Sequence, residues 1–312
     1  MKEKLLSFLC CPKCKNELRL MNPIREHNEI KTGLLQCNSC QESYPIQDFI
    51  PRFVETDKYV DTFSFEWKKH QSTQLDSINK TTESKTTLKE KTGFDLNDLK
   101  GKLVLDAGCG MGRFMEVVNK YGGEVVGVDL SFAVEAAFEN MGLNPNYHII
   151  QADIFELPFK PESFDYIFSI GVLHHTSDTQ QAFSQLVPLL KKGGKVAIWV
   201  YDAYLSKILF LSQQYRRITV HLPKWLLYFL SHIALFYYYL IKIPFLGHSF
   251  HFLLPISCHP NWRWRVLDTF DWYSPKYQWK HTYPEVYNWF KTTGLKNIRL
   301  LKVPVALSGE KD

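Results

Sequence analysis

Residues 102–114, KLVLDAGCGMGRF, carry the pattern that most clearly indicates the fold of this chain. An apolar run ends at Asp106, a turn follows with glycines at 108, 110 and 112, and an amphipathic segment begins at Arg113. This is the order of a buried strand, a tight turn and a helix, in which backbone N–H groups can approach a ligand closely. The sequence therefore predicts a ligand site at this turn.

The turn departs from the dinucleotide-binding fingerprint. In that fingerprint, G-x-G-x-x-G, the third glycine would fall at Arg113, but here Gly112 comes one residue early. Asp106 stands two residues before Gly108, where a carboxylate can hold an ammonium group and would repel a pyrophosphate. The pattern thus counts against a nicotinamide dinucleotide.

Working outward, four more apolar runs predict strands at 124–129, 147–153, 164–170 and 195–201. Segments with helical periodicity lie between them, at 113–121, 132–141 and 178–191. Strands that alternate with helices predict an α/β fold with a doubly wound, mostly parallel, Rossmann-like sheet, which binds ligands at the carboxyl ends of its strands. After it, Pro284 is expected to open a helix through Phe290, and strands are expected within 298–305.

Two further acids end the next two predicted strands. Asp129 follows Asp106 by 23 residues, and Asp153 follows Asp129 by 24. An acid at the end of the second strand can accept both ribose hydroxyls, and one at the end of the third can accept an adenine amine. Three carboxylates without a phosphate-binding glycine pattern suit a ligand with an amine, a ribose and an adenine.

The motifs VLDAGCGMGRF, VVGVDLS, QADIFELPF, FDYIFSIGVLHHT and LKKGGKVAIWVY occur in this order over residues 102–201. Together they resemble the successive motifs of class I S-adenosylmethionine-dependent methyltransferases. The resemblance implies that the glycine loop packs under the methionine part of the cofactor, that one acid contacts its amino group, and that the others read its ribose and adenine. The cofactor-binding residues it implies are Asp106, Gly108, Gly110, Gly112, Asp129, Leu130, Asp153, Ile154, Ser169 and Gly171.

His174 and His175 follow the fourth strand, near the place where the methyl group would lie. Methyl transfer from a sulfonium requires donor and acceptor in line and, for some acceptors, removal of a proton. Histidine titrates near neutrality, so either residue is a candidate base. The alternative is that this pair is a structural feature of the loop.

Near the N-terminus, Cys11 and Cys14 form one C-x-x-C pair and Cys37 and Cys40 another, with 22 residues between them. Two such pairs predict a tetrahedral zinc site that stabilises a small domain. A redox role is disfavoured because neither pair opens a helix after a strand. Seven cysteines, an odd number, and no visible secretory signal indicate a reducing compartment.

The segments LLSFLCCPKCKNELRL, GLLQCNSC and YPIQDFIPRF resemble the small zinc-binding domains similar to the tRNA-methyltransferase activator Trm112. Members of that family usually carry glycine where this chain has Phe49, and they occur alone as partners of methyltransferases or fused in front of one. The expected domains are a Trm112-like domain or zinc ribbon at 1–55, a helical linker at 56–100, and a methyltransferase domain at 101–312. In the linker, three aromatic residues within 61–70 indicate either docking to the next domain or a lid over the cofactor. The polar run at 71–91, rich in Ser, Thr and Lys, predicts a solvated helix or a linker.

An insert at 203–265 interrupts the methyltransferase domain. It contains seven Lys or Arg, no Asp or Glu, and fifteen aromatic residues, whereas the net charge of the whole chain is only +5. Its run without charged residues, 225–241, is too short to span a membrane. Three interpretations remain open: a buried pair of lid helices, an interfacial helix, or a site for a lipid-like acceptor. Peripheral membrane contact through 205–255 is therefore expected.

Taken together, these patterns predict a methyltransferase that uses S-adenosylmethionine and structural zinc and acts on a small-molecule or lipid-linked metabolite. The alternative is an RNA methyltransferase whose zinc ribbon and basic insert hold RNA, although the insert is too apolar to make nucleic acid the expected partner. A non-enzymatic activator is disfavoured because the glycine loop and all three acids are present. The expected location is the cytoplasm, with peripheral contact at the inner face of the membrane. A composition of 45% hydrophobic and 22% charged residues excludes a disordered or collagen-like chain.

Overall fold

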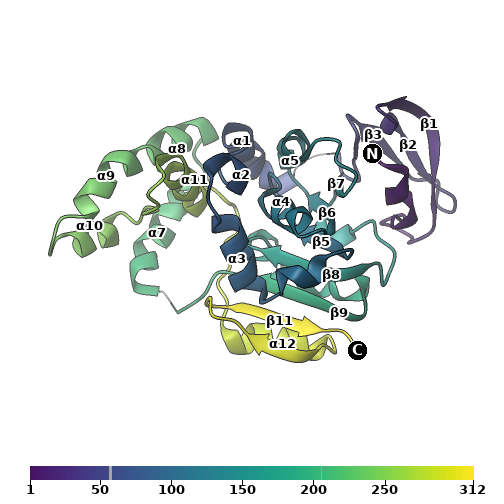
Figure 1. Cartoon of the computed structure of the whole chain (residues 1–312). Coiled ribbons are helices and arrows are strands. Elements are labelled where there is room, and N and C mark those ends of the chain that lie inside the picture. Colours follow the sequence, from purple (N-terminus) through teal and green to yellow (C-terminus); the bar gives the residue numbers. More distant parts are fainter. Residues whose placement is uncertain (56–57, 205) are drawn as a thin grey trace.

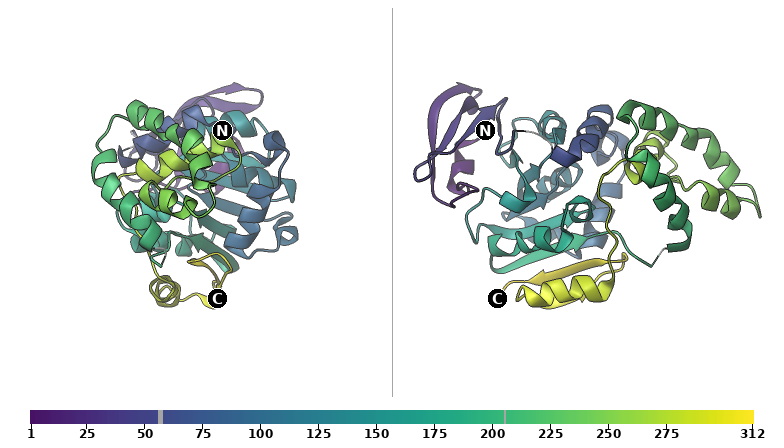
Figure 2. Two further views of the ribbon diagram at one scale, coloured as in Figure 1. Left: turned by 90° about the vertical axis from the view of Figure 1, so that its left-hand side faces the viewer. Right: turned by 180° about the vertical axis from the view of Figure 1, so that it is seen from behind.

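The computed structural model describes residues 1–55, 58–204 and 206–312. A small antiparallel sheet and a group of helices lie at opposite ends of a central sheet (Figures 1 and 2). The central sheet has the order β10-β11-β9-β8-β5-β6-β7, and only β11 runs against its neighbours. The predicted α/β class with a mostly parallel sheet is confirmed. Its strands are β5 (Leu103–Ala107), β6 (Glu124–Asp129), β7 (Tyr147–Gln151), β8 (Phe164–Ile170), β9 (Leu190–Trp199), β10 (Lys296–Leu300) and β11 (Ala306–Glu310).

Helices cover both faces of this sheet, so β5, β6, β7 and β8 are buried on both sides and read as nearly continuous apolar runs, whereas the edge strand β10 is mostly exposed. Neighbouring residues of one strand point to different cores: Val104 belongs to one hydrophobic cluster and Leu105 to the other. The first face carries α3 (Glu83–Thr92), α4 (Arg113–Lys120) and α5 (Ala133–Met141), and the second carries α6 (Thr179–Ser184) and α12 (Tyr283–Thr292). The start of α12 is fixed by a capping box between Thr282 and Glu285.

Three segments differ from their predictions. The helix expected over 178–191 ends at Ser184, because Pro188 opens a short 3-10 turn and β9 already begins at Leu190. Of the segment 298–305, where strands are expected, residues 298–300 belong to β10 and residues 301–305 form the connection to β11, which begins at Ala306. The polar segment 71–91 contains the short α2 (Asp76–Asn79) and α3, and α3 is not a solvated helix, because Leu88 is fully buried in the core.

The N-terminal domain is a four-stranded antiparallel sheet made of β1 (Leu18–Glu26), β2 (Glu29–Cys37), β3 (Ser43–Gln47) and β4 (Ile50–Pro51). Its core is continuous with that of the catalytic body, since Leu5 and Leu9 belong to the same cluster as Phe159. Backbone hydrogen bonds tie the two together, from Cys10 N–H to the Pro158 carbonyl (2.9 Å) and from Phe53 N–H to the Gln151 carbonyl (2.8 Å).

Phe49 adds a further contact between these two parts. Its φ of 68° lies in the left-handed region, where glycine is favoured and a bulky residue is strained. Its ring stacks on Phe138 of α5, with centroids 5.3 Å apart and an interplanar angle of 12°. This position therefore adopts the left-handed backbone that glycine favours, and its side chain packs against the body.

At the opposite end, residues 206–253 form what we call the arm. It consists of α7 (Ser206–Thr219), α8 (Lys224–Ser231), α9 (Ile233–Ile241) and α10 (Gly247–Leu253), and it rests on α11 (Trp262–Tyr273). The insert expected at 203–265 is thus helical, and its last helix continues to Tyr273. Among the described residues, no helix is long and apolar enough to cross a membrane.

Candidate active site

A cavity of about 570 Å³ opens at the carboxyl ends of the parallel strands. Its floor is formed by residues that follow β5, β6, β7 and β8, and its cover comes from α1 (Asp61–Lys69) and α11. Phe63, Glu66 and Trp67 of α1 all line it. Of the two roles left open for the aromatic segment 61–70, the position of α1 favours the lid.

The glycine loop after β5 lies against two neighbours that leave no space for side chains. Gly108 has a φ of 93°, and a Cβ there would lie 2.3 Å from a methyl group of Val172, in the loop after β8. A Cβ on Gly110 would lie 3.3 Å from the indole of Trp67. Close approach therefore requires glycine at position 108, and the two loops form one continuous wall.

Asp129, at the end of β6, is oriented by three donors. Its Oδ2 accepts from Gly110 N–H (2.9 Å), and its Oδ1 accepts from the N–H (2.8 Å) and the hydroxyl (2.6 Å) of Ser131. Burial raises the pKa of this carboxyl in spite of these hydrogen bonds. The carboxylate is thus pre-positioned at the cavity wall and links the glycine loop to the second strand.

Asp106 and Asp153 complete the row of acids. Asp106 is 1% exposed, its Oδ2 has no hydrogen-bond partner among the described residues, and burial raises its pKa well above the usual range. A buried carboxylate oxygen without a partner is costly, so this atom fits a ligand ammonium group. Asp153 lines the cavity, and its Oδ1 accepts from Phe155 N–H (3.1 Å). These hydrogen-bond acceptors fit the amine and adenine ends of S-adenosylmethionine.

The other cofactor-binding candidates fall into two groups. Ser169 and Gly112 are not among the described lining residues: the Ser169 hydroxyl donates to the Ala107 carbonyl (2.7 Å), and Gly112 faces Met141 of α5. Asp106 likewise lies behind the surface of the cavity. The candidates that line it are Gly108, Gly110, Asp129, Leu130, Asp153, Ile154 and Gly171.

The two histidines occupy different environments. His175 lines the cavity and its Nδ1 donates to the Tyr277 carbonyl (2.8 Å), which leaves Nε2 as the accepting nitrogen of the neutral ring. Burial lowers the pKa of His175. His174 is fully buried, neither ring nitrogen has a partner within the described part of the chain, and its ring stacks on Tyr201 with centroids 3.9 Å apart. It does not appear among the described lining residues.

Three carboxyl groups that the sequence did not single out line the side of the cavity that α1 and α11 form. Glu66 comes from α1, and Asp268 and Asp271 come from α11. The Tyr201 hydroxyl donates to Asp271 Oδ2 (3.2 Å), whereas Glu66 Oε2 has no partner in the described ranges. Burial raises the pKa of all three carboxyls, that of Asp268 to about 7. No motif marks them, because α1 and α11 lie outside the strand-and-loop pattern.

Two partly buried basic side chains also line the cavity. The Arg113 guanidinium donates to Gln74 Oε1 (3.1 Å) and Ser84 Oγ (3.2 Å) and lies 5.0 Å from the ring centroid of Trp264. Lys91 Nζ lies 3.1 Å from the ring centroid of Trp199, and burial lowers its pKa to about 7. Arg113 follows the glycine loop directly, so it is placed to bind a carboxylate at that end.

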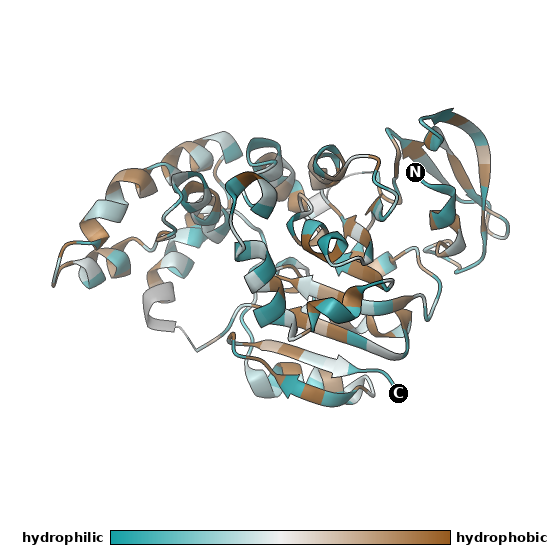
Figure 3. Cartoon of the chain, in the orientation of Figure 1, coloured by the Kyte–Doolittle hydropathy of each residue, from teal (hydrophilic) through white to brown (hydrophobic). Residues whose placement is uncertain are grey.

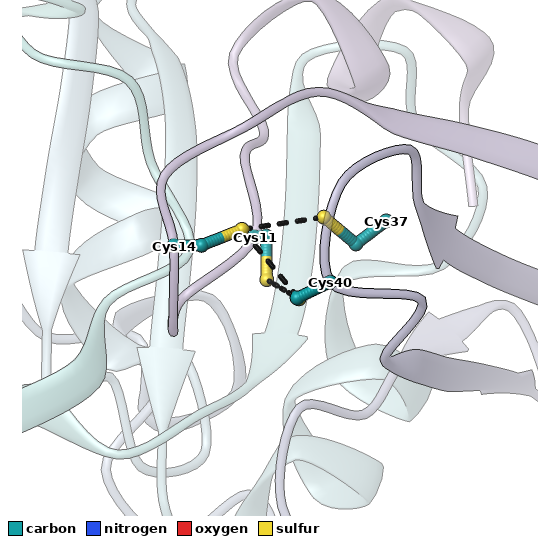
Figure 4. A group of neighbouring side chains, drawn as sticks. All are labelled: Cys11, Cys14, Cys37 and Cys40. Carbon is teal, nitrogen blue, oxygen red and sulfur yellow. Dashed lines mark hydrogen bonds between the residues drawn. The ribbon is translucent and has the colours of Figure 1, made fainter.

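The four cysteines of the N-terminal domain converge on one point (Figure 4). Their Sγ atoms all lie within 4.8 Å of one another, with Cys14–Cys37 at 3.4 Å, Cys14–Cys40 at 3.5 Å and Cys11–Cys40 at 3.6 Å. Zinc–sulfur bonds of about 2.3 Å in a tetrahedron place sulfurs about 3.8 Å apart. The predicted cluster of Cys11, Cys14, Cys37 and Cys40 is confirmed and fits zinc.

This cluster adjoins one wall of the cavity. Lys15, next to Cys14, donates to the Leu157 carbonyl (3.0 Å), and Cys10 N–H donates to the Pro158 carbonyl. Leu157 lines the cavity together with Asp153 and Ile154. The first zinc-binding turn therefore supports the segment that carries Asp153 and Ile154, the residues predicted to contact adenine.

Two protein-family models match the chain. Residues 105–198 match a methyltransferase domain, and residues 2–48 match the Trm112p-like protein family. The chain thus carries a methyltransferase domain behind a Trm112-like domain, as the motifs predicted. The methyltransferase domain and the four-cysteine cluster support S-adenosylmethionine and zinc as the cofactors.

The chain is similar to known methyltransferases over about a third of its length. Phosphoethanolamine N-methyltransferase 2 of Caenorhabditis elegans is 36% identical over 107 residues, which cover 32% of this chain and 24% of the relative. Ubiquinone biosynthesis O-methyltransferase of Coxiella burnetii is 38% identical over 102 residues (31% and 43%). The tRNA (carboxymethyluridine(34)-5-O)-methyltransferase of Saccharomyces cerevisiae is 32% identical over 105 residues (32% and 36%). The chain therefore spans less than half the length of each of these relatives.

Proposed function

We propose that this chain is an S-adenosylmethionine-dependent methyltransferase whose acceptor is a small-molecule or lipid-linked metabolite. The observation that carries the proposal is a single cavity lined by two sets of residues. The strand ends contribute Asp129 and Asp153, which suit the cofactor, and the covering helices contribute aromatic and acidic side chains, which suit an acceptor. Donor and acceptor held in one enclosed space is the main requirement for in-line methyl transfer.

At the cofactor end, each candidate has a distinct task. We assign the amino group of the bound cofactor to Asp106, its carboxylate to Arg113, its ribose hydroxyls to Asp129 and its adenine to Asp153. When bound, S-adenosylmethionine supplies an electrophilic methyl group on a positively charged sulfur. Trp67 packs over Gly110 and helps to exclude water from this region.

At the acceptor end, we assign the proton-accepting role to His175. Its lowered pKa keeps the ring neutral near pH 7, and the hydrogen bond to Tyr277 fixes which nitrogen can accept a proton. His174 remains the other candidate of the pair, although its stacking on Tyr201 favours a supporting role. Asp271, which interacts electrostatically with His175, would stabilise the charged ring after proton transfer.

We place the protein in the cytoplasm, with peripheral contact at the inner face of the membrane through residues 205–255. The aromatic and basic composition of this segment supports the placement. The same location would give the enzyme access to lipid-linked acceptors.

An RNA acceptor is the second candidate. The observation in its favour is the similarity to the yeast tRNA methyltransferase, which is close to that of the two metabolite methyltransferases. Against it, the exposed surface of the arm is apolar and aromatic, whereas RNA binding relies on dense basic and polar side chains.

The experiment is a methyl-transfer assay with the full-length, zinc-loaded protein. The protein is incubated with methyl-labelled S-adenosylmethionine and an extract of its host, and label is counted in organic, small-molecule, RNA and protein fractions. Label in the organic or small-molecule fraction supports the proposal, and label confined to RNA replaces it with the second candidate.

Two variants serve as controls for this assay. Asp129→Ala removes the carboxylate that we assign to the ribose hydroxyls. We expect it to weaken cofactor binding at least about thirtyfold, the equivalent of about 2 kcal/mol. Glu55→Gln changes an exposed carboxylate that does not line the cavity and is expected to leave binding unchanged. Equal cofactor affinity of the Asp129→Ala variant and the unchanged protein would refute the ribose assignment.

A further inference from the structure

The arm carries a continuous row of exposed apolar side chains. The helices α8 and α9 are almost one helix, since the residue between them, His232, keeps right-handed helical angles (φ −69°, ψ −13°). Steps of four, four, three, four and three residues keep positions on one helical face. We call the row the outer stripe; its side chains are 39–79% exposed and belong to Trp225, Phe229, Ile233, Phe236, Leu240 and Ile243.

The opposite face of these helices is already occupied. Leu227 and Ala234 are buried, and Leu227 packs against Phe270 and Tyr273 of α11. The outer stripe therefore has no partner within the described parts of the chain. Soluble proteins rarely leave a contiguous apolar surface of this kind without a binding role. Figure 3 shows apolar segments along the arm, away from the central sheet.

The tip of the arm extends this surface. Phe245, in the turn between α9 and α10, is fully exposed although its φ of 64° is unfavourable for a bulky residue. Leu246 beside it is more than half exposed, as is Leu253 at the other end of α10. An aromatic side chain that is fully exposed on an unfavourable backbone conformation is more consistent with insertion into a partner than with packing against the rest of the chain.

The charge around the stripe decides which partner fits. Residues 203–265 contain no acid, and Arg217, Lys242 and Arg263 are exposed. A second copy of this chain would bring two surfaces of the same charge together, which opposes association. A bilayer with anionic lipids offers both an apolar boundary and the opposite charge.

The length of the stripe fits the same partner. From Trp225 in α8 to Leu240 in α9 it measures about 23 Å at about 1.5 Å per residue, and Ile243 follows just beyond the end of α9. No helix within the described ranges could span a membrane. A helix of this kind lies in the plane of the interface, with its apolar face at the boundary between headgroups and acyl chains. Exposed Trp225 and Tyr239 are the side chain types enriched at that depth.

We propose that the outer stripe and the tip of the arm dock on the surface of a bilayer that contains anionic lipids. The inference deepens the proposed function, and it rests on that function because it takes the cavity to be the site of methyl transfer. The helix α11 lies between the helices of the stripe and this cavity. Its residues Trp264, Leu267 and Asp268 line the cavity, while Phe270 contacts the helices of the arm. Docking would bring the acceptor side of the cavity next to the lipid.

The test is co-sedimentation of the full-length, zinc-loaded protein with vesicles. Vesicles of phosphatidylcholine alone are compared with vesicles that contain about 30% phosphatidylglycerol. We expect at least about tenfold tighter binding to the anionic vesicles, and a loss of at least about tenfold on Phe229→Ser combined with Phe236→Ser. Lys242→Glu should weaken binding to the anionic vesicles by about fivefold or more and have little effect on neutral ones.

Ile24→Ser is the matched control, because Ile24 is 65% exposed on β1, at the other end of the molecule. The proposal is overturned if the unchanged protein binds neither kind of vesicle, or if the stripe variant binds as well as the control. It is also overturned if sedimentation shows a dimer that the stripe variant dissociates. Binding of S-adenosylhomocysteine by each variant shows that it is folded, and methyl transfer measured on the same samples separates a failure of docking from a failure of the enzymatic assignment.

Discussion

The zinc-binding domain buries its large apolar side chains against the catalytic body, whereas the arm leaves a row of them in water. Leu5 and Leu9 are each 1% exposed, in one cluster with Phe159 of the body. Phe229 and Phe236 of the arm are 69% and 79% exposed. Both parts are small additions to the same sheet, so the difference lies in what their apolar surface does: in the first it stabilises the fold, and in the second it remains free for a partner.

The two parts also differ in how they are attached. The zinc-binding domain joins the body through backbone hydrogen bonds and the buried Arg52, which donates to Gln151 Oε1 (2.7 Å) and pairs with Glu135 (3.0 Å). The arm is attached through α11 and through an ion pair of Lys224 with Asp61 on α1. A substitution that destabilises the zinc-binding domain should therefore also destabilise the body, whereas a substitution on the outer stripe should not.

The largest effect is expected from loss of the metal. Cys37→Ser removes a buried ligand, and structural zinc contributes on the order of 10 kcal/mol to small domains. We expect zinc content to fall and the midpoint of thermal unfolding to drop by more than about 10 °C for the whole chain, because the core is shared. Metal analysis and calorimetry provide the measurement. Cys258→Ser, which removes an exposed thiol outside the cluster, is the control, and equal melting of the two variants would contradict the zinc assignment.

Leu9→Ala tests the shared core directly. The side chain is fully enclosed between the two domains, so its loss should lower the free energy of unfolding by about 2–4 kcal/mol. Urea unfolding followed by tryptophan fluorescence measures it. A loss below about 1 kcal/mol would mean that the zinc-binding domain is only loosely docked, and the contrast with the arm would then disappear.

The pH dependence of the free energy of unfolding tests the burial of a carboxyl group on α11, the helix on which the arm rests. Burial raises the pKa of Asp268 on α11 to about 7, whereas an unfolded aspartate titrates near about 3.9. The folded, unliganded protein then binds the proton more tightly than the unfolded chain, so this group makes stability fall as the pH rises from about 4 to about 7. Asp268→Asn should flatten that fall between about pH 4 and about pH 7 in urea unfolding. Glu55→Gln should leave the profile unchanged, and an identical slope in Asp268→Asn would rule out this carboxyl as the source of the fall.

The smallest effect is expected on the outer stripe. Phe236→Ser alters a side chain that is 79% exposed, and its exposure implies few packing contacts to lose. The free energy of unfolding should change by less than about 0.5 kcal/mol, while solubility without lipid should rise. Urea unfolding and the concentration at the onset of turbidity measure the two quantities. A loss above about 1 kcal/mol would show that the stripe packs within the chain and would remove the contrast with Leu9.

The comparison also explains what the sequence could and could not predict. Asp106 lies in β5, Asp129 ends β6, and Asp153 follows β7. The doubly wound topology alone brings such positions to one edge of the sheet. The four cysteines were equally accessible to prediction, because metal ligation imposes a short and regular spacing. These parts depend on local geometry, which a linear pattern records.

The acceptor side could not be predicted in the same way. Glu66 and Asp268 lie in distant parts of the sequence, and only the packing of α1 on α11 brings them into one cavity. Burial of α3 was missed because one leucine, Leu88, and small polar residues form its packed face, which reads as a solvated segment. The exposure of the outer stripe was left open, since an apolar run looks the same whether it is buried or not.

The bridge between Leu9 and Phe159 has a consequence for the order in which the chain matures. During synthesis, residues 1–55 leave the ribosome well before the segment that covers their inner face; Arg52 precedes its partner Gln151 by 99 residues. At about 5–20 residues per second this interval lasts about 5–20 s. Throughout it, the nascent domain has only its metal and its own small core to hold Leu5 and Leu9 out of water. Until the segment around Phe159 has been synthesised, early binding of zinc would therefore stabilise the nascent domain in its place. A shortage of zinc would then lower the yield of newly folded protein before it affected molecules that are already folded.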